Sequence, residues 1–155
     1  MKDLASKVIQ AYAGRTVATA ESCTGGGIGQ ALTAVAGSSA VYKGGVVSYC
    51  DEVKMRLLGV KEDTLQTYGA VSAPVAEEMA VGAICGLCTD VSVSVTGLAG
   101  PGGDTYGNPV GTVFIGYADA RQVFSREFHF TGDREEIRQQ ATQQALSILL
   151  ERANQ

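Results

Sequence analysis

A serine in the setting of a nucleophile lies early in the chain. Ser22 follows a short apolar, β-branched run at 16–20 and precedes three consecutive glycines at 25–27. Where a strand turns into a helix, backbone N–H groups are left unpaired, and they can hold a phosphate or a developing oxyanion. Ser22 is therefore placed to attack a carbonyl carbon, or else Ser22 and Thr24 only cap the helix. The residues expected to contact the substrate here are Cys23, Thr24, Gly25 and Gly26.

A serine nucleophile needs a general base, and the sequence offers a lysine rather than a histidine. His129 is the only histidine and lies between two phenylalanines on an expected strand, so alternation turns it toward solvent. Lys54 lies in the first turn after a second strand, where the helix dipole disfavours an ammonium and lowers its pKa. Tyr49 precedes it and could relay a proton or orient the lysine. The alternative is that Lys54 is an ordinary solvated helix residue.

Two further segments could bind a phosphate or a sugar. The stretch 96–103 follows an apolar strand and contains four glycines, which let a ligand approach the backbone closely. A plain surface loop is the alternative for this stretch. Arg134 and Arg138 lie one turn apart in the last expected helix, where they could bind a phosphate or pair with the neighbouring glutamates. The expected ligand contacts of the glycine-rich stretch are Thr96, Gly97 and Gly100.

The four cysteines raise two other possibilities. Cys23 and Cys50 flank the candidate site, and a helix N-terminus lowers the pKa of a thiol, so a cysteine nucleophile is a rival to Ser22. Cys85 and Cys88 have the spacing of half a zinc site or of a redox pair. They fall within an apolar helical pattern and lack a second ligand pair, so we expect two small buried residues. No metal and no cofactor are expected.

The hydrophobic pattern predicts the scaffold that positions these groups. Helices and strands alternate along most of the chain, which is typical of a sheet covered by helices, and a hairpin near the end makes the sheet mixed. Ligands in such sheets lie beyond the carboxyl ends of the strands, where the turns 21–27, 49–54 and 96–107 would converge. The expected helices are 3–13, 25–36, 51–58, 62–68, 74–87 and one beginning at 131–133, and the expected strands are 16–20, 45–50, 91–96, 110–117 and 123–130.

Length and charge limit the class of protein. The chain has 155 residues, of which 45% are hydrophobic, and this fits one domain that needs no metal or disulfide to fold. Its net charge is −4 and its isoelectric point about 4.9, so an acidic surface argues against nucleic-acid binding. No apolar run reaches the length of a membrane helix and no signal-peptide core is present, so we expect a cytoplasmic protein that does not bind membranes.

Several motifs in one order carry a family resemblance. They run from Ala20–Gly26 through Tyr49, Lys54, Gly69–Ser72 and Thr96–Gly103 to Pro109–Val113 and Gly132–Arg134. With these motifs the chain resembles the C-terminal domain family of the competence/damage-inducible protein CinA, the nicotinamide-nucleotide amidase family, over nearly its whole length. The resemblance implies a three-layer α/β/α sandwich with a mixed sheet and a single amidase domain over residues 1–155, in a stand-alone form.

The resemblance also implies an activity and the residues that perform it. The expected reaction is deamidation of nicotinamide mononucleotide to nicotinic acid mononucleotide and ammonia. Ser22 matches the family's nucleophile, Lys54 its base and Tyr49 its helper tyrosine. Two departures stand out: the family's Tyr-Ser-Asn is here Tyr49-Cys50-Asp51, and the loop 104–108 lacks a lysine found in many members. An anionic Asp51 near Lys54 would raise the lysine pKa and weaken it as a base.

Rival functions remain open at this point. The same loops could hold a nucleotide without turnover, as a regulatory module related to CinA. A purely structural subunit is a further alternative, although glycine-rich loops at three strand ends are costly features for a scaffold. The expected partners are a small nucleotide substrate and a second copy of the chain in a homo-oligomer. Phe124, Phe128 and Phe130 could serve either the core or a contact between two copies.

Overall fold

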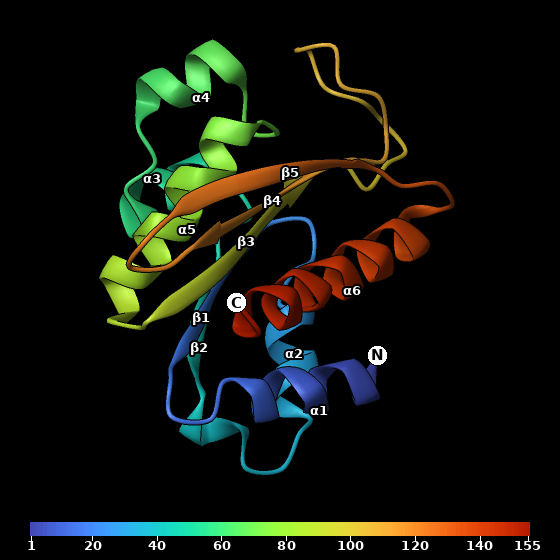
Figure 1. The fold of residues 1–155 in the computed structure, drawn as a ribbon. Helices are drawn as coiled ribbons and strands as arrows, with labels where there is room; N and C mark the ends of the chain where they lie inside the picture. The colour runs from blue at the N-terminus through green and yellow to red at the C-terminus, as the bar shows by residue number, and fades with distance from the viewer.

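Five strands form one mixed sheet in the computed structural model, which describes residues 1–155 (Figure 1). The spatial order is β2-β1-β3-β4-β5. The strand β1 pairs in parallel with β2 and β3, whereas β4 pairs antiparallel with both β3 and β5. The expected α/β class with a mixed sheet is therefore confirmed. The strands are β1 (Val17–Glu21), β2 (Tyr42–Val47), β3 (Val91–Gly97), β4 (Thr112–Ala118) and β5 (Val123–His129).

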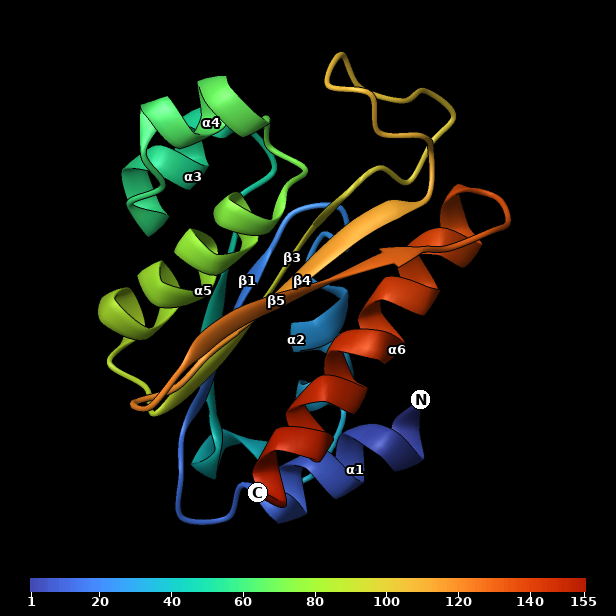
Figure 2. The same ribbon diagram turned by 45° about the horizontal axis from the view of Figure 1, so that its top comes forward.

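Helices cover both faces of the sheet and make three layers. One face carries α1 (Lys2–Ala11), α2 (Gly27–Thr33) and α6 (Arg134–Ala153), and α5 (Ala73–Leu87) lies across the other (Figures 1 and 2). The short α3 (Asp51–Leu58) and α4 (Glu62–Tyr68) pack beside α5. A 3-10 turn at Ser38–Ala40 precedes β2. This is the expected α/β/α arrangement.

Two apolar clusters hold the layers together. The larger joins β3 and β4 to α1, α2 and α6 through residues such as Val93, Ile115 and Leu146. The smaller joins β1 to α5, where Ala18 packs with Met79. Because each large apolar side chain contributes roughly 1.5–3 kcal/mol when buried, the clusters fix the sheet on both faces. The central strands β1 and β3 are therefore held in place by packing on both faces of the sheet.

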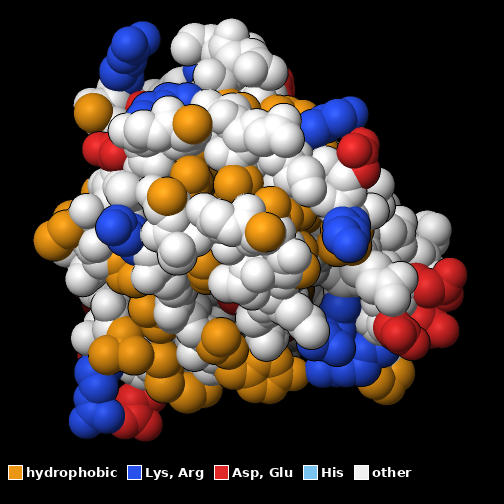
Figure 3. Space-filling view, turned by 90° about the horizontal axis from the view of Figure 1, so that it is seen from below, with side chains coloured by type: hydrophobic (Ala, Val, Ile, Leu, Met, Phe, Trp, Pro, Cys, Tyr) orange, Lys and Arg blue, Asp and Glu red, His pale blue; other side chains and the backbone are white.

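The face of the molecule seen in Figure 3 carries apolar, polar and charged side chains. On the face of the molecule seen from below, apolar side chains lie among polar ones, and charged side chains of both signs are distributed around the rim (Figure 3). Isolated apolar side chains on a surface are ordinary, because folded proteins lack enough polar atoms to cover it.

The segment after β1 differs from the sequence expectation. The helix α2 starts only at Gly27, because Gly25 and Gly26 have φ values of +59° and +99° in the left-handed region that helices do not use. Neither Ser22 nor Thr24 caps it, since the helix has no side-chain cap hydrogen bond. The capping interpretation of these two residues was therefore wrong, and the segment between β1 and α2 forms a turn of its own.

The other boundaries agree more closely. Ser72 caps α5 and Asp133 caps α6 in a capping box, as their residue types predict. The second strand is Tyr42–Val47 rather than 45–50, so Tyr49 and Cys50 lie in the connection to α3.

Cys85 and Cys88 are exposed, which makes their predicted burial wrong. The buried stripe of α5 follows Val75, Met79 and Ala83, so a residue two positions after Ala83 points away from the sheet. No group of three or more histidine, cysteine or acidic side chains is arranged to hold a metal ion. No helix combines the length and apolar character needed to cross a membrane.

Candidate active site

A cavity of about 310 Å³ opens at the carboxyl ends of β1 and β3. Because β1, β2 and β3 are parallel, the segments that follow them leave the sheet at the same edge. The three turns expected to converge there do so, and α6 adds a residue from its first turn. The lining residues include Ser22, Cys23, Tyr49, Asp51, Lys54 and Arg134, with most of the stretch 96–102.

Ser22 and Lys54 face each other in this cavity. The Nζ atom of Lys54 lies 3.2 Å from the Oγ atom of Ser22 and donates a second hydrogen bond of 2.9 Å to the carbonyl of Ser48. The Ser22 N–H donates to the Val95 carbonyl, which ties the residue after β1 to β3. Only 8% of Ser22 and 2% of Lys54 are exposed. The Lys54 ammonium is therefore held against the Ser22 hydroxyl with little exposure to solvent.

Burial lowers the pKa of Lys54 below its usual value of 10.5. The negative charge of Asp51 acts in the opposite direction and raises it, followed by smaller contributions from Cys50 and Cys23. Burial outweighs these charges because no carboxylate lies within ion-pair distance of the ammonium. The sequence predicted a lowered pKa for Lys54 and the direction is correct, although desolvation rather than the helix dipole is the leading cause. A lysine with a lowered pKa can act as a general base.

Glu21 is a buried carboxylate beneath the turn, and only 1% of the residue is exposed. It accepts hydrogen bonds from the Thr24 hydroxyl at 2.6 Å and from the N–H groups of Ile28 and Gly29 at 3.0 Å each. The N-terminus of α2 is thus satisfied by a side chain from the end of β1. Glu21 was not among the site residues predicted from the sequence, although an acidic residue closing an otherwise apolar strand was the available signal.

Two backbone N–H groups beside Ser22 lack an acceptor in the protein. The Ser22 carbonyl accepts from Gly25 and the Thr24 carbonyl from Gly27, which closes the turn. The N–H groups of Cys23 and Thr24 donate to no backbone or side-chain atom. Unpaired N–H groups next to a nucleophile can stabilise an oxyanion.

The thiol of Cys23 is poorly suited to nucleophilic attack. The residue is 5% exposed, and burial raises the pKa of its thiol to about 11. A thiol with this pKa is almost entirely protonated near neutral pH. The expectation that the helix N-terminus would lower the pKa of this cysteine is therefore wrong, and the geometry favours Ser22.

Arg134 joins two walls of the cavity. Its guanidinium donates to the Gly100 carbonyl at 2.6 Å and to the Tyr49 hydroxyl at 2.9 Å. Tyr49 is 62% exposed, and its hydroxyl forms no hydrogen bond with Ser22 or Lys54. Arg134 makes no ion pair within the chain, so its charge is available to an anionic ligand.

Comparison with known proteins identifies the family. The sequence profile described as the CinA C-terminal domain matches residues 1–153. The chain belongs to the CinA C-terminal domain family. Solved structures agree, because a CinA superfamily protein from Klebsiella pneumoniae superposes with a TM-score of 0.96 at 36% identity, covering 99% of this chain and 97% of that one. The competence/damage-inducible protein CihA from Agrobacterium tumefaciens superposes with a TM-score of 0.94 at 42% identity, covering 99% of this chain and 95% of that one.

Curated relatives of this CinA domain fall into two sizes. The nicotinamide-nucleotide amidohydrolase PncC of Escherichia coli K12 is 48% identical over 137 residues, which cover 88% of this chain and 83% of PncC. A CinA-like protein of Thermosynechococcus vestitus is 51% identical over 138 residues, which cover 87% of this chain. The matched region spans only 33% of that longer relative.

Some of the residues expected to bind the substrate line the cavity, and the others lie outside it. The hydroxyl of Thr96 lies beside the cavity but donates to the Ala70 carbonyl at 2.8 Å. Arg138 lies outside the cavity, with its guanidinium on the carbonyls of Cys23 and Thr24. His129 is exposed on β5 and pairs with Glu127, as its strand position predicts. The expected residues that line the cavity are Cys23, Thr96, Gly97, Gly100 and Arg134, and those that do not are Thr24, Gly25, Gly26 and Arg138.

Proposed function

We propose that this CinA domain hydrolyses the carboxamide of nicotinamide mononucleotide, giving nicotinic acid mononucleotide and ammonia. The observation that carries the proposal is the 3.2 Å contact between the Lys54 Nζ and the Ser22 Oγ. It is supported by the likeness to PncC, a nicotinamide-nucleotide amidohydrolase that is 48% identical over most of both chains. In this proposal residues 1–155 work as one amidase domain, in keeping with a family match over residues 1–153.

Acylation begins with Lys54 in its neutral form. Its Nζ takes the proton from the Ser22 hydroxyl while the Oγ bonds to the carboxamide carbon. The negative charge that develops on the carbonyl oxygen is held by the free N–H groups of Cys23 and Thr24. One such donor contributes roughly 3–4 kcal/mol to the transition state. The protonated Lys54 then gives its proton to the leaving nitrogen, the C–N bond breaks, and ammonia departs from the Ser22 ester.

Deacylation repeats the sequence with water. Neutral Lys54 takes a proton from a water molecule, whose oxygen bonds to the ester carbon and displaces the Ser22 Oγ. The serine recovers its proton from Lys54, and nicotinic acid mononucleotide leaves. One lysine thus serves both steps, because it alternates between base and acid within hydrogen-bond reach of the same oxygen.

The substrate phosphate is assigned to the wall formed by Arg134 and the stretch 97–102. The guanidinium offers a full positive charge, and the glycines of the stretch leave its backbone accessible to a ligand. Tyr49 holds Arg134 from the opposite side, since its hydroxyl accepts from the guanidinium at 2.9 Å. With Lys54 already in contact with Ser22, we assign Tyr49 to orienting Arg134 rather than to relaying a proton.

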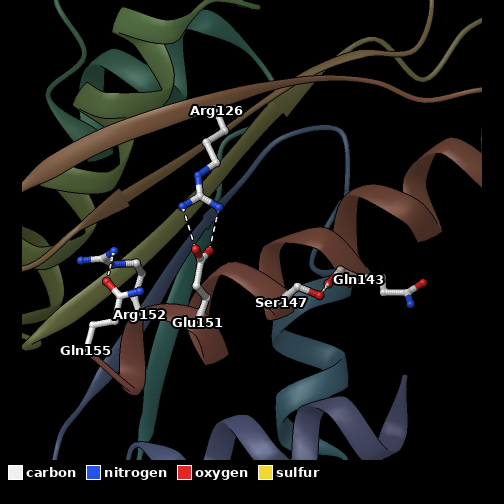
Figure 4. A network of polar contacts seen from close by, with 6 residues as sticks. All are labelled: Arg126, Gln143, Ser147, Glu151, Arg152 and Gln155. Carbon is white, nitrogen blue, oxygen red and sulfur yellow. Dashed lines mark hydrogen bonds and ion pairs between the residues drawn. The ribbon is translucent and has the colours of Figure 1, made fainter.

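The experiment incubates the purified, chelator-treated protein with nicotinamide mononucleotide and quantifies both products. Ser22→Ala removes the proposed nucleophile. Ser147→Ala is the matched control, because this α6 hydroxyl donates to the Gln143 carbonyl (Figure 4) and does not line the cavity. The proposal would be supported if wild type and Ser147→Ala each released ammonia and nicotinic acid mononucleotide in a one-to-one ratio and Ser22→Ala released neither. A folded wild type that forms neither product would overturn it.

A further inference from the structure

Arg138 lies outside the cavity and donates two hydrogen bonds to the turn that follows Ser22. Its Nε donates to the Cys23 carbonyl at 2.9 Å and its Nη2 to the Thr24 carbonyl at 3.3 Å. These two carbonyls are the only polar partners of the guanidinium, which takes part in no ion pair. A Cβ at Gly25 would lie 3.1 Å from the Nη2 atom, so the glycine allows this close approach. The contact links α6 to a turn 115 residues earlier in the chain.

The hydrogen bond from Arg138 to the Cys23 carbonyl also determines the direction of the Thr24 N–H. The bond between Cys23 and Thr24 is trans, since the one cis bond of the chain is Gly100–Pro101. In a trans peptide the C=O and the following N–H point in opposite directions. Holding the Cys23 carbonyl toward Arg138 therefore turns the Thr24 N–H away from it, and this N–H has no acceptor in the protein.

The turn also forms a wall between two hollows. Ser22 and Cys23 line the cavity that contains Lys54, whereas Thr24 and Arg138 line a separate hollow against α6. The carbonyls bound by Arg138 thus face the second hollow. A Thr24 N–H that points away from the Cys23 carbonyl points away from the Arg138 guanidinium, toward the side of the turn on which Ser22 and Cys23 line the cavity.

We propose that Arg138 is a positioning residue for the oxyanion site: it fixes the Cys23–Thr24 peptide so that the Thr24 N–H faces the reacting carbonyl oxygen. In this role Arg138 touches no substrate and does not bind the phosphate. Glu21 supports the same turn from beneath, through the Thr24 hydroxyl. The inference rests on the proposed amidase function and names one source of its transition-state stabilisation.

The test measures kcat and KM for nicotinamide mononucleotide in Arg138→Met and Arg138→Lys. Met keeps the apolar stem and removes both hydrogen bonds, and Lys restores one donor. The matched control is Arg126→Met, which removes the bidentate ion pair of Arg126 with Glu151 that ties α6 to β5 far from the turn (Figure 4). Loss of one oxyanion donor lowers kcat about 100-fold or more. We expect that loss in Arg138→Met with KM within about threefold, partial recovery in Arg138→Lys, and wild-type values in the control.

A second substrate separates this inference from the proposed function. p-Nitrophenyl acetate acylates a reactive serine without any nucleotide, and its acylation of Ser22 is accompanied by release of p-nitrophenol. If the wild type ignores the nucleotide but reacts with the ester, the proposed substrate fails, and the ester rates decide on Arg138. A wild type inert to both substrates would overturn the inference, since no nucleophile would be left to position.

The remaining outcomes decide in the same way. A wild-type kcat in Arg138→Met would overturn the inference, and so would a rise in KM alone, because that result would make Arg138 a substrate-binding residue. If Arg138→Met does not fold, Arg138→Lys decides. A lowered kcat with a native unfolding temperature in Arg138→Lys supports positioning, and an unchanged kcat contradicts it.

Discussion

The Nζ of Lys54 and the Oγ of Ser22 are 3.2 Å apart, although the two residues leave the sheet from different strands. Ser22 comes directly after β1, and Lys54 reaches it from α3, which begins four residues after β2. The Nζ of Lys54 also donates a hydrogen bond to the Ser48 carbonyl, which helps to hold it beside Ser22. Because base and nucleophile touch inside a buried site, the protonation state of Lys54 should control turnover.

Removing the charge of Asp51 should make Lys54 a better base. Asp51 raises the pKa of Lys54 against the larger effect of burial. Asp51→Asn therefore lowers that pKa further, and more of the lysine is neutral near pH 7. The rise of kcat/KM with pH should shift to lower pH, with faster turnover at neutral pH. Profiles of kcat/KM against pH measure the shift.

Glu52→Gln is the control for Asp51→Asn. It removes one negative charge from the same first turn of α3, but Glu52 pairs with Arg56 at 3.6 Å and does not act on Lys54. A pH profile that moves equally in both variants would show that the shift comes from net charge rather than from Asp51. That result would contradict the specific action of Asp51 on the pKa of Lys54.

Replacing Lys54 should change how stability depends on pH. The folded-state pKa of Lys54 lies below its ordinary value of 10.5, so the unfolded chain binds the proton more tightly. Below the folded pKa the native state bears the full cost of the buried ammonium, and this cost disappears as pH rises toward 10.5. Relative to Lys54→Met, the wild type should therefore gain stability across that window.

Denaturant unfolding at a series of pH values measures this difference. Lys54→Met also loses the hydrogen bond to the Ser48 carbonyl, so the test uses the slope of the stability difference with pH and not its absolute size. Lys61→Met serves as the control, because Lys61 is exposed. A difference between wild type and Lys54→Met that stays constant with pH would mean that the pKa of Lys54 is not lowered by folding.

Arg134 should govern affinity for the phosphate. Arg134→Gln removes the positive charge from the cavity wall while keeping a polar side chain. A charged hydrogen bond of roughly 1.5–3 kcal/mol corresponds to a rise in KM of about 10- to 100-fold for nicotinamide mononucleotide, with kcat nearly unchanged. Nicotinamide riboside, which lacks the phosphate, should be turned over equally by both proteins. A similar loss with both substrates would exclude phosphate binding as the role of Arg134.

Tyr49 should act through Arg134 and not through Lys54. Tyr49→Phe keeps the ring and removes the hydroxyl that accepts from Arg134. Because the pair is exposed and contributes about 1 kcal/mol, we expect KM to rise about fivefold with kcat within twofold. Steady-state kinetics measure both constants. A large fall in kcat at constant KM would instead support the proton relay or the orientation of Lys54 that the sequence offered as roles for this tyrosine.

Glu21 should matter for folding and for turnover together. Glu21→Gln replaces one of the two carboxylate oxygens by an N–H₂ group, which then faces the N–H of Ile28 or of Gly29, and a buried donor without an acceptor costs roughly 1–3 kcal/mol. The turn that carries Ser22 loosens as a result, and kcat falls. Thermal unfolding and ammonia release measure the two effects. Glu127→Gln, on the exposed β5 edge, should leave both values unchanged.

Much of this site is predictable from local sequence. Ser22 and Lys54 each come shortly after an apolar strand, and neighbouring parallel strands deliver the residues after their carboxyl ends to one edge of the sheet. The caps Ser72 and Asp133 were equally predictable, because their side-chain oxygens satisfy N–H groups a few residues away. In these cases the type of the residue and its neighbours in the sequence are enough to predict its position.

The contacts that shape the turn do not have such local causes. Arg138 lies one helical turn from Arg134, yet only the docking of α6 decides that one faces the cavity and the other the Cys23 carbonyl. The late start of α2 depends on the positive φ of Gly25 and Gly26, which the glycines permit but do not require. Cys85 and Cys88 fit an apolar helical pattern, but α5 had too many apolar positions for the pattern to identify its buried face.

Capture of the covalent intermediate tests the central claim most directly. Wild-type protein is mixed with nicotinamide mononucleotide, quenched in acid during the first turnovers, digested, and examined by mass spectrometry. We predict a nicotinic acid mononucleotide ester on the peptide that contains Ser22, formed with one equivalent of ammonia and absent from Ser22→Ala and Lys54→Met. Ammonia release with no ester on that peptide, or with the acyl group on Cys23, would contradict the assignment of Ser22 as the nucleophile.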